Sequence, residues 1–483
     1  MVEKSIKKNA IYNVINQGSA IFFQLITIKY VTSVLHTENY GRVNFCNSII
    51  SYFFMLAQLG ISSYMVREGA AIRDDKKKFN DLANEIFTIS VLSTLVSILL
   101  YIVTIFAWGR LEKDKLILYI LGIQLVLNFF NVEWINNIYE DFKYIAIRNL
   151  IIQIISFFCI FLFVKNKDDF LIYALIIALS SSLSFIVNFT HGRKVVELRF
   201  TSKINLKRHI VPIMILFFNN LSVLVYVNSD ITILGILESD STVGIYSVSV
   251  KIYTVVKRIF QAIVVVSIPR LSNYLSTGQS DNYRNLLEKI QCVLVSIVFP
   301  MFVGLFMVAP NAILILSEPE YLSGVTALRI LCVALIFSSL ANYHISCILI
   351  PNKLDKMVLF ATIISAFVNV LMNFILIPHL SLNGAAITTV MAEAIVMIIV
   401  FISSGEYRRQ KNVVNVMFKS IVGCIGIVLV CSAIQKFDFS FVIDTLLKIA
   451  ISIVVYVIIE CMVKNQLFVD NISKLFGRLN MKI

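Results

Sequence analysis

Charged residues and proline are scarce in this sequence. Of its 483 residues, 15% are Asp, Glu, Lys or Arg and seven are proline, whereas 58% are hydrophobic. A water-soluble chain usually has about 25% charged and about 45–50% apolar residues, so the composition excludes a soluble enzyme. The 17 glycines and few prolines also exclude a low-complexity or disordered chain. The length and hydrophobicity together predict one large membrane domain.

The motifs of several chemistries are also missing. The eight cysteines lie mostly within apolar stretches and form no CxxC pair, and the five histidines include no HExxH motif. We therefore expect no metal site and no disulfide framework. The cysteines are expected to pack as small hydrophobic side chains. No GxxxxGK[ST] motif occurs, so the chain has no ATP-binding loop of its own.

Long stretches without charged residues predict membrane-spanning helices, because a helix needs about 20 apolar residues to cross the hydrocarbon core. The clearest stretches are 9–28, 43–66, 86–109, 116–132, 149–164, 170–192, 209–229, 290–317 and 330–352. The stretch 357–392 is long enough for two helices with a break at residues 378–384, and 242–266, 413–435 and 441–463 carry few charges. The total is about fourteen helices. No segment alternates like a barrel strand, so the predicted fold class is an all-α polytopic membrane protein.

The basic residues fall mostly on one side of these predicted spans. With fourteen helices and a cytoplasmic N-terminus, 29 of the 42 Lys and Arg lie in cytoplasmic segments and six in outer loops. Such an asymmetry in short loops follows the positive-inside rule and predicts that both termini are cytoplasmic. It also explains the net charge of +13 without nucleic-acid binding.

The two halves of the chain resemble each other. Tyr40-Gly41 opens a span that ends at Arg67, and Gly244-Ile245-Tyr246 opens a span that ends at Arg270, 203 positions later. A polar loop follows the span in both halves. Lys7-Lys8 stands before the first span of the first half, and Lys207-Arg208 stands before the first span of the second half. The pattern predicts a parallel repeat of six helices, as in many transporters. The predicted domains are an N-terminal lobe at 1–200, a C-terminal lobe at 201–405, and two further helices with a cytoplasmic tail at 406–483.

Three short segments of the sequence resemble the oligosaccharide flippases, which transport O-antigen or capsule repeat units. The resemblance rests on residues 59–69 with the basic loop behind them, on the Tyr40-Gly41 start of that span, and on the Gly-Ala-Ala-Ile-Thr opening at 384–388. These flippases belong to the multidrug/oligosaccharidyl-lipid/polysaccharide exporter superfamily. Membership would imply two six-helix lobes around a central cavity that opens alternately to each side.

The resemblance also implies a function and a location. The cargo would be an undecaprenyl-pyrophosphate-linked oligosaccharide, moved from the cytoplasmic to the outer leaflet of a bacterial cytoplasmic (inner) membrane for O-antigen, capsule or exopolysaccharide assembly. Expected partners are this substrate, membrane lipids, and the polymerase and chain-length machinery of the same pathway. We expect neither an enzymatic activity nor a nucleic-acid partner.

Ionisable residues at membrane depth are costly unless paired or hydrated and are therefore functional candidates. The candidates for the substrate cavity are Lys29, Glu133, Trp134, Asp230, Lys251, Lys257, Arg258, Arg329 and Glu393. Lys251 and Arg258 share one helical face with Thr254, and such a basic wall suits a pyrophosphate. Alternatively, Lys257 and Arg258 lie at the cytoplasmic boundary of their helix.

Other candidates also have two interpretations each. Lys29 and Asp230 are 201 positions apart and could pair between the lobes, or each could extend to the interface. Glu133 and Trp134 lie among asparagines that suit sugar hydroxyls but equally suit helix–helix hydrogen bonds.

Glu393 could bind a coupling H⁺ or Na⁺, or pair with Arg329. Arg67 and Arg270 match by repeat and could gate the cavity or hold lipid phosphates, or they are ordinary cytoplasmic anchors.

Two alternative functions remain in view. A multidrug/cation antiporter of the same superfamily needs acidic cavity residues, whereas the intramembrane candidates comprise five bases and three acids. The excess of bases favours an anionic cargo. The second alternative is a membrane polysaccharide polymerase or ligase. Enzymes of that kind carry a large outer loop, whereas the longest outer loop predicted here is only about 309–323.

Overall fold

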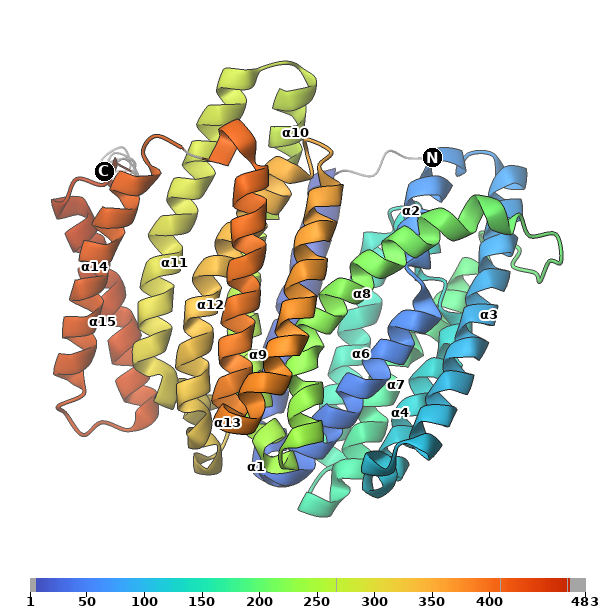
Figure 1. The fold of residues 1–483 in the computed structure, drawn as a ribbon, viewed down its shortest axis with the longest axis horizontal. Helices are drawn as coiled ribbons and strands as arrows, with labels where there is room; N and C mark the ends of the chain where they lie inside the picture. The colour runs from blue at the N-terminus through green and yellow to red at the C-terminus, as the bar shows by residue number, and fades with distance from the viewer. Residues whose placement is uncertain (1–5, 266, 409, 467, 470–483) are drawn as a thin grey trace, which may run out of the picture. The chain divides into compact units, whose positions relative to one another are not determined.

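The computed structural model describes residues 6–265, 267–408, 410–466 and 468–469. Within these ranges every regular element is a helix (Figure 1), which confirms the predicted all-α fold. Eleven helices in the described ranges are long and apolar enough to cross a membrane. The count of about fourteen stays a prediction. The predicted cytoplasmic ends, 1–5 and 470–483, lie outside the described residues.

The chain divides into two compact units, residues 1–244 and 245–483. The first unit holds α1 (Ile6–Gln58), α2 (Ile61–Ile72), α3 (Lys76–Ala107), η1 (Gly109–Asp114), α4 (Lys115–Leu127), η2 (Asn128–Phe130), α5 (Glu133–Ile138), α6 (Phe142–Phe163), η3 (Lys167–Asp169), α7 (Phe170–Gly192) and α8 (Leu206–Leu237). The helix α9 (Asp240–Val265) starts in the first unit and continues into the second.

The second unit continues with α10 (Ile268–Ser276), α11 (Ser280–Leu316), η4 (Pro319–Gly324), α12 (Val325–Tyr343), η5 (His344–Leu349), α13 (Asp355–Ser403), η6 (Gly405–Arg408), α14 (Val413–Ile434) and α15 (Phe441–Met462). Each unit thus contains two long helices separated by a short one, α1–α2–α3 in the first and α9–α10–α11 in the second. The division into 1–200, 201–405 and 406–483 stays a prediction.

Two of the longest helices contain a sharp break. The backbone of α1 leaves the helical region at His36, with φ 58°, and that of α13 leaves it at Ser381, with φ 50°. The two arms of α13 run antiparallel, because Ser365 Oγ donates to the carbonyl oxygen of Ala392 at 2.9 Å. This confirms the break predicted at residues 378–384.

The stretch 116–132 does not form the single helix predicted from its lack of charges. The helix α4 ends at Leu127, and a 3₁₀ turn and the short α5 follow. The Asn128 side chain donates to Thr94 Oγ1 in α3 at 3.0 Å, and the Asn131 side chain donates to Asn128 Oδ1 at 3.0 Å. These bonds attach the segment that follows α4 to α3.

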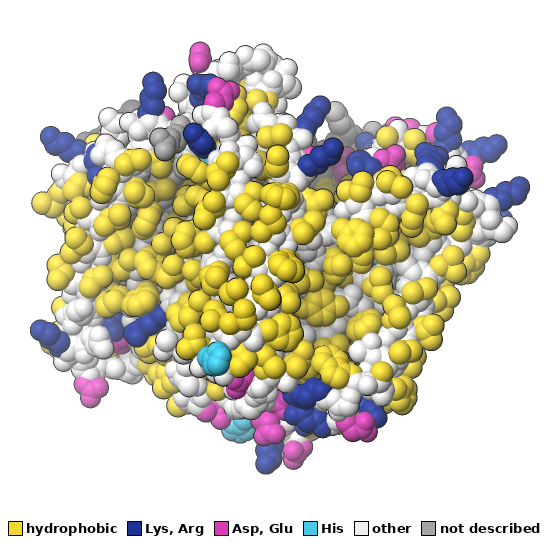
Figure 2. Space-filling model, in the orientation of Figure 1, with side chains coloured by type: hydrophobic (Ala, Val, Ile, Leu, Met, Phe, Trp, Pro, Cys, Tyr) yellow, Lys and Arg dark blue, Asp and Glu magenta, His cyan; other side chains and the backbone are white. Residues whose placement is uncertain are grey.

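Apolar side chains cover the outward surface of the helices. On α3, for example, Leu92, Val96, Leu99 and Phe106 are all more than half exposed. Figure 2 shows a wide belt of hydrophobic side chains over the helices, with Lys, Arg, Asp and Glu gathered at its two edges. An exposed apolar belt of this extent is typical of a surface that faces lipid.

Candidate functional site

The first unit contains a charged cluster within its helices, formed by Glu133, Asn136, Arg148 and Asn188. Arg148 Nη2 in α6 lies 3.5 Å from Glu133 Oε1 at the start of α5, and its Nη1 donates to Asn188 Oδ1 in α7. Asn136 Nδ2 donates to the same oxygen at 3.0 Å. The Arg148 side chain is 5% exposed and that of Glu133 is 33% exposed. The cluster therefore joins three helices and leaves part of one carboxylate accessible.

The same arginine connects the cluster to α1. Arg148 Nε and Nη2 donate to Asn149 Oδ1 at 3.1 and 2.8 Å. Asn149 Nδ2 in turn donates to Asn16 Oδ1 in α1 at 3.1 Å. A guanidinium with this many partners is held in one orientation.

Trp134 takes no part in that cluster. Its side chain is 3% exposed and lies in a hydrophobic core with Met65, Phe79, Ile135 and Ile138. Such burial leaves the indole no open face for a sugar. The structure thus supports the packing interpretation of Trp134 and its neighbouring asparagines.

The second unit contains a smaller charged cluster, formed by Tyr253, Lys257 and Glu393. Lys257 Nζ in α9 lies 2.5 Å from Glu393 Oε1 in α13, and the Tyr253 hydroxyl donates to the same carboxylate at 2.8 Å. The Glu393 side chain is 4% exposed and that of Lys257 is 19% exposed. Tyr246 OH and Thr389 Oγ1, 3.3 Å apart, extend this polar line between the two helices.

The other candidate bases of the second unit are Lys251, Arg258 and Arg329. Lys251 is half-buried on α9, and Arg258 is exposed. Arg329 in α12 donates to the carbonyl oxygen of Phe306 at 3.3 Å, and its guanidinium lies 5.2 Å from the centre of that ring. Glu393 therefore pairs with Lys257 and not with Arg329, because Arg329 is directed toward α11.

Lys29 and Asp230 lie in two helices of the first unit that pack together, α1 and α8. Asp230 is buried and Lys29 is half-buried. Next to Asp230, Asn228 Nδ2 donates to Ser51 Oγ and Thr232 Oγ1 donates to Ser48 Oγ, both at 2.9 Å. The face of α8 around Asp230 is thus polar. A Lys29–Asp230 pair stays a prediction.

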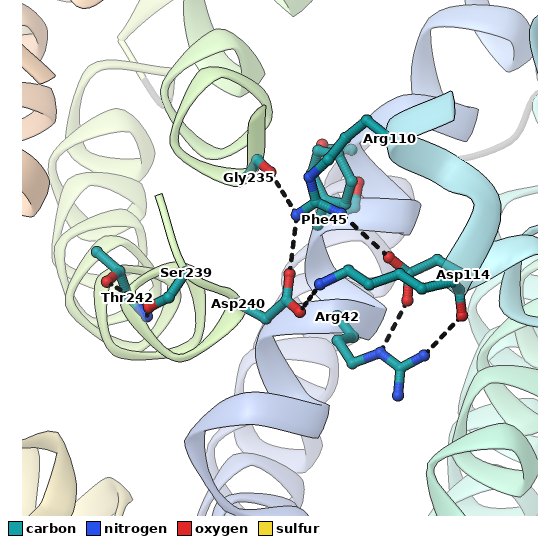
Figure 3. A network of polar contacts seen from close by, with 10 residues as sticks. Arg42, Phe45, Arg110, Asp114, Gly235, Ser239, Asp240 and Thr242 are labelled. Atoms are coloured by element: carbon teal, nitrogen blue, oxygen red, sulfur yellow. Dashed lines mark hydrogen bonds and ion pairs between the residues drawn. The ribbon is translucent and has the colours of Figure 1, made fainter. Parts of the chain in front are cut away.

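A second network of charges joins α1, η1 and the start of α9 in the first unit, and we call it the Asp240 clamp (Figure 3). Arg110 Nη2 lies 3.0 Å from Asp240 Oδ1 and donates to the Gly235 carbonyl oxygen at 2.6 Å, while Lys113 Nζ pairs with Asp240 Oδ2. The Asp240 side chain is 5% exposed. The first turn of α9 is therefore fixed to η1.

The clamp extends to α1 through a second aspartate. Arg42 Nε lies 2.8 Å from Asp114 Oδ1, and the Asp114 side chain is fully buried. Arg110 lies 3.6 Å from the other oxygen of Asp114 and stacks on the Phe45 ring at 4.9 Å. Two carboxylates and three bases thus form one connected set.

Beside the clamp, α1 and α9 cross at two glycines. A Cβ on Gly41 would overlap the carbonyl oxygen of Asp240 and lie 2.8 Å from the amide nitrogen of Gly244. A Cβ on Gly244 would overlap the carbonyl oxygen of Thr37 and lie 3.2 Å from the amide nitrogen of Gly41. The two backbones approach so closely that only glycine fits at either position.

The family described as "Polysaccharide biosynthesis protein" matches this chain over residues 6–275. The chain belongs to this family. Its sequence is 22% identical over 414 residues to the Escherichia coli (strain K12) protein named "Putative O-antigen transporter", which covers 83% of this chain and 98% of that protein. The membership predicted from residues 59–69 and 384–388 is confirmed.

Two solved structures have a similar fold to this member of the polysaccharide biosynthesis family. The "Lipid II flippase MurJ, inward closed conformation" matches with a TM-score of 0.75 and 15% identity, over 95% of this chain and 99% of that one. A eukaryotic MATE transporter matches with a TM-score of 0.53 and 13% identity, over 86% of this chain and 99% of that one. These relatives are named as transporters or flippases, in agreement with the prediction of a transport protein in the membrane.

Arg67 and Arg270 occupy matching short helices in this family member, α2 and α10. Both side chains are exposed: Arg67 Nε lies 3.1 Å from Glu68 Oε1, and Arg270 Nε donates to Tyr274 OH at 2.9 Å. Each has a local partner within its own helix. A role in gating or in holding lipid phosphates stays a prediction.

The sequence analysis missed Arg148, Asp114 and Asp240. Arg148 falls just outside the predicted span 149–164, although α6 begins at Phe142 and Arg148 lies almost two turns inside it. Asp114 and Asp240 lie at predicted outer loops, where a solvated charge is expected. The bases that pair with these aspartates, Arg42, Arg110 and Lys113, are visible in the sequence. Which base pairs with which aspartate is visible only in the fold, because the partners come from distant segments.

Proposed function

We propose that this chain is a flippase for an undecaprenyl-pyrophosphate-linked oligosaccharide, which it moves from the cytoplasmic to the outer leaflet of a bacterial inner membrane. The transport would supply O-antigen, capsule or exopolysaccharide assembly. The family match, the name of the E. coli relative and the MurJ-like fold support this class of cargo.

The observation that carries the proposal is a paired and nearly buried charge within the spans of each unit. Arg148 pairs with Glu133, and Lys257 pairs with Glu393. Buried charges in a membrane helix are expensive and are retained mostly for function. Lys251 and Arg258 add two further positive charges to α9, the same helix as Lys257. Such an excess of bases suits the pyrophosphate of the proposed cargo.

The mechanism that we propose is alternating access, in which two lobes expose the charged residues first to one side and then to the other. Glu393 is the candidate for coupling to H⁺ or Na⁺, because its buried carboxylate pairs with Lys257 and a bound H⁺ or Na⁺ would compete with that lysine. Both termini would lie in the cytoplasm. The polymerase and chain-length machinery of the same pathway would be the partners that use the product.

The test starts from a strain that lacks this gene. We expect the lipid-linked oligosaccharide to accumulate on the cytoplasmic face and the surface polymer to disappear, and both effects to be reversed by the wild-type chain. A Lys251→Ala/Arg258→Ala variant should fail to reverse them. A Lys76→Ala/Lys77→Ala variant, which removes two exposed bases elsewhere, should succeed. No accumulation, with increased sensitivity to cationic dyes instead, would contradict the proposal and favour a cation antiporter.

A further inference from the structure

The first unit carries an apolar groove on its surface that none of the charged clusters uses. The groove has a volume of about 570 Å³ and is lined mainly by Leu56, Leu59, Ile89, Leu92, Val96 and Met214. These residues come from α1, α3 and α8, except Leu59, which lies between α1 and α2. Leu92 and Val96 are about half exposed, so the groove is open along its side.

One end of the groove is formed by a connecting segment, residues 193–205, which we call the strap. Ile204 of the strap and Leu206 at the start of α8 complete the lining. The strap is fixed to α3 by its backbone: the Thr201 amide donates to Thr88 Oγ1 at 3.1 Å, and the Asn205 amide donates to Glu85 Oε2 at 2.7 Å. The groove thus has a defined polar end.

The start of α8 is held equally firmly. His209 is fully buried, and its ring nitrogens lie 2.7 Å from Tyr64 OH and 3.1 Å from Glu85 Oε2. The same glutamate therefore anchors both the strap and α8. Hydrogen bonds thus hold this end of the groove in place.

This end of the groove is strongly basic. Residues 193–208 contain six Lys or Arg and one Glu, and that glutamate, Glu197, already pairs with Arg199 at 2.8 Å. Lys203, Lys207 and Arg208 are exposed. Lys203 adjoins the lining residue Ile204 in the chain, and Lys207 adjoins the lining residue Leu206. Figure 2 shows Lys and Arg side chains at the upper right, where both α3 and α8 begin.

We propose that the groove is a binding site for an acidic phospholipid, with one acyl chain along α3 and the phosphate at Lys203, Lys207 and Arg208. The lining is apolar enough for a hydrocarbon chain, and basic residues next to the apolar belt attract acidic headgroups. The lining contains none of the charged residues proposed for the cargo, so this site does not depend on the proposed function.

The experiment measures lipid binding to the purified full chain by native mass spectrometry. Phosphatidylglycerol and phosphatidylcholine with identical acyl chains are the probes. We expect the wild-type chain to bind phosphatidylglycerol at least about tenfold more tightly, a difference of about 1.4 kcal/mol. Equal affinity for the two lipids would overturn the proposal, because it would indicate ordinary lipid contact without a headgroup site.

Two variants separate the headgroup end from the apolar groove. Replacing Lys203, Lys207 and Arg208 by Gln should abolish the preference for phosphatidylglycerol. Val96→Trp, which fills the groove, should weaken the binding of phosphatidylglycerol by about tenfold or more. Unchanged affinity in either variant would overturn the proposal.

The matched control replaces Lys76, Lys77 and Lys78 by Gln. These three lysines are exposed at the start of α3, so the variant changes the net charge of the chain by the same amount. It should keep the preference for phosphatidylglycerol. A loss as large as that of the strap variant would mean that surface charge in general, and not the strap, selects the lipid. Thermal unfolding of each variant verifies that it is folded.

Discussion

Lys257 and Glu393 form an ion pair of 2.5 Å between α9 and α13, and the hydroxyl of Tyr253 donates to the same carboxylate. Both residues lie within helices that are long and apolar enough to cross a membrane. In such surroundings each charge depends on the other, since a single buried charge without a partner is far more costly than the pair.

The first prediction follows from this dependence. Lys257→Ala and Glu393→Ala should each destabilise the chain by about 3–5 kcal/mol, because each leaves the other charge unpaired. The double variant should be less destabilised than the sum of the two. Thermal unfolding in detergent measures the three effects. Strict additivity would show that the two side chains do not act together.

Arg148 gives a second prediction. Arg148→Lys retains the charge but cannot contact Glu133, Asn149 and Asn188 at the same time. We expect it to lose most of the ability to restore the surface polymer in the deletion strain, and Arg148→Ala to lose all of it. Lys143→Ala, an exposed base in the same helix, is the control and should behave as wild type. Full activity of Arg148→Lys would mean that the charge alone is needed.

The glycine crossing gives a third prediction. Gly41→Ala should destabilise the chain by several kcal/mol or prevent its folding, because the new Cβ would overlap backbone atoms of Asp240 that cannot move aside. Gly304→Ala in α11 is the control, since its Cβ would meet no atom within 4 Å. Alanine is preferred over glycine inside a helix by roughly 0.5–1 kcal/mol, so this variant should be as stable as wild type or slightly more. The level of folded protein and its unfolding temperature distinguish the two.

The Asp240 clamp gives a fourth prediction. Asp240→Asn keeps the size of the side chain but removes the charge that faces Arg110 and Lys113. We expect a loss of about 1–3 kcal/mol, measured as a lower unfolding temperature. Asp438→Asn, which changes an exposed aspartate, should leave that temperature unchanged. An equal effect of both variants would indicate a general effect of charge and not the clamp.

Much of the fold could be predicted from the sequence, because the surface that a membrane helix turns toward lipid must be apolar. The break at Ser381 was foreseen from the proline, glycine and asparagine around it. The end of α4 was not, since Asn128 carries no charge and its bond to Thr94 in α3 is visible only in the fold.

The candidate site was less accessible to prediction. The helical face of Lys251 and Arg258 was expected to carry the charge, but Lys257 on another face makes the ion pair. Spacing along a helix gives the faces, whereas the neighbouring helix decides which of them meets a partner. Arg148 was missed for the same reason, because its partners Glu133 and Asn188 come from two other helices.

The contact between Gly41 and Gly244 has an internal symmetry. Each glycine approaches the carbonyl group four residues before the other, so the contact reads the same from both sides. In symmetric homodimers one surface meets its own copy in this reciprocal way. Residues 37–41 and 240–244 are thus related by a local twofold symmetry, so a substitution at either glycine meets the same kind of backbone obstacle.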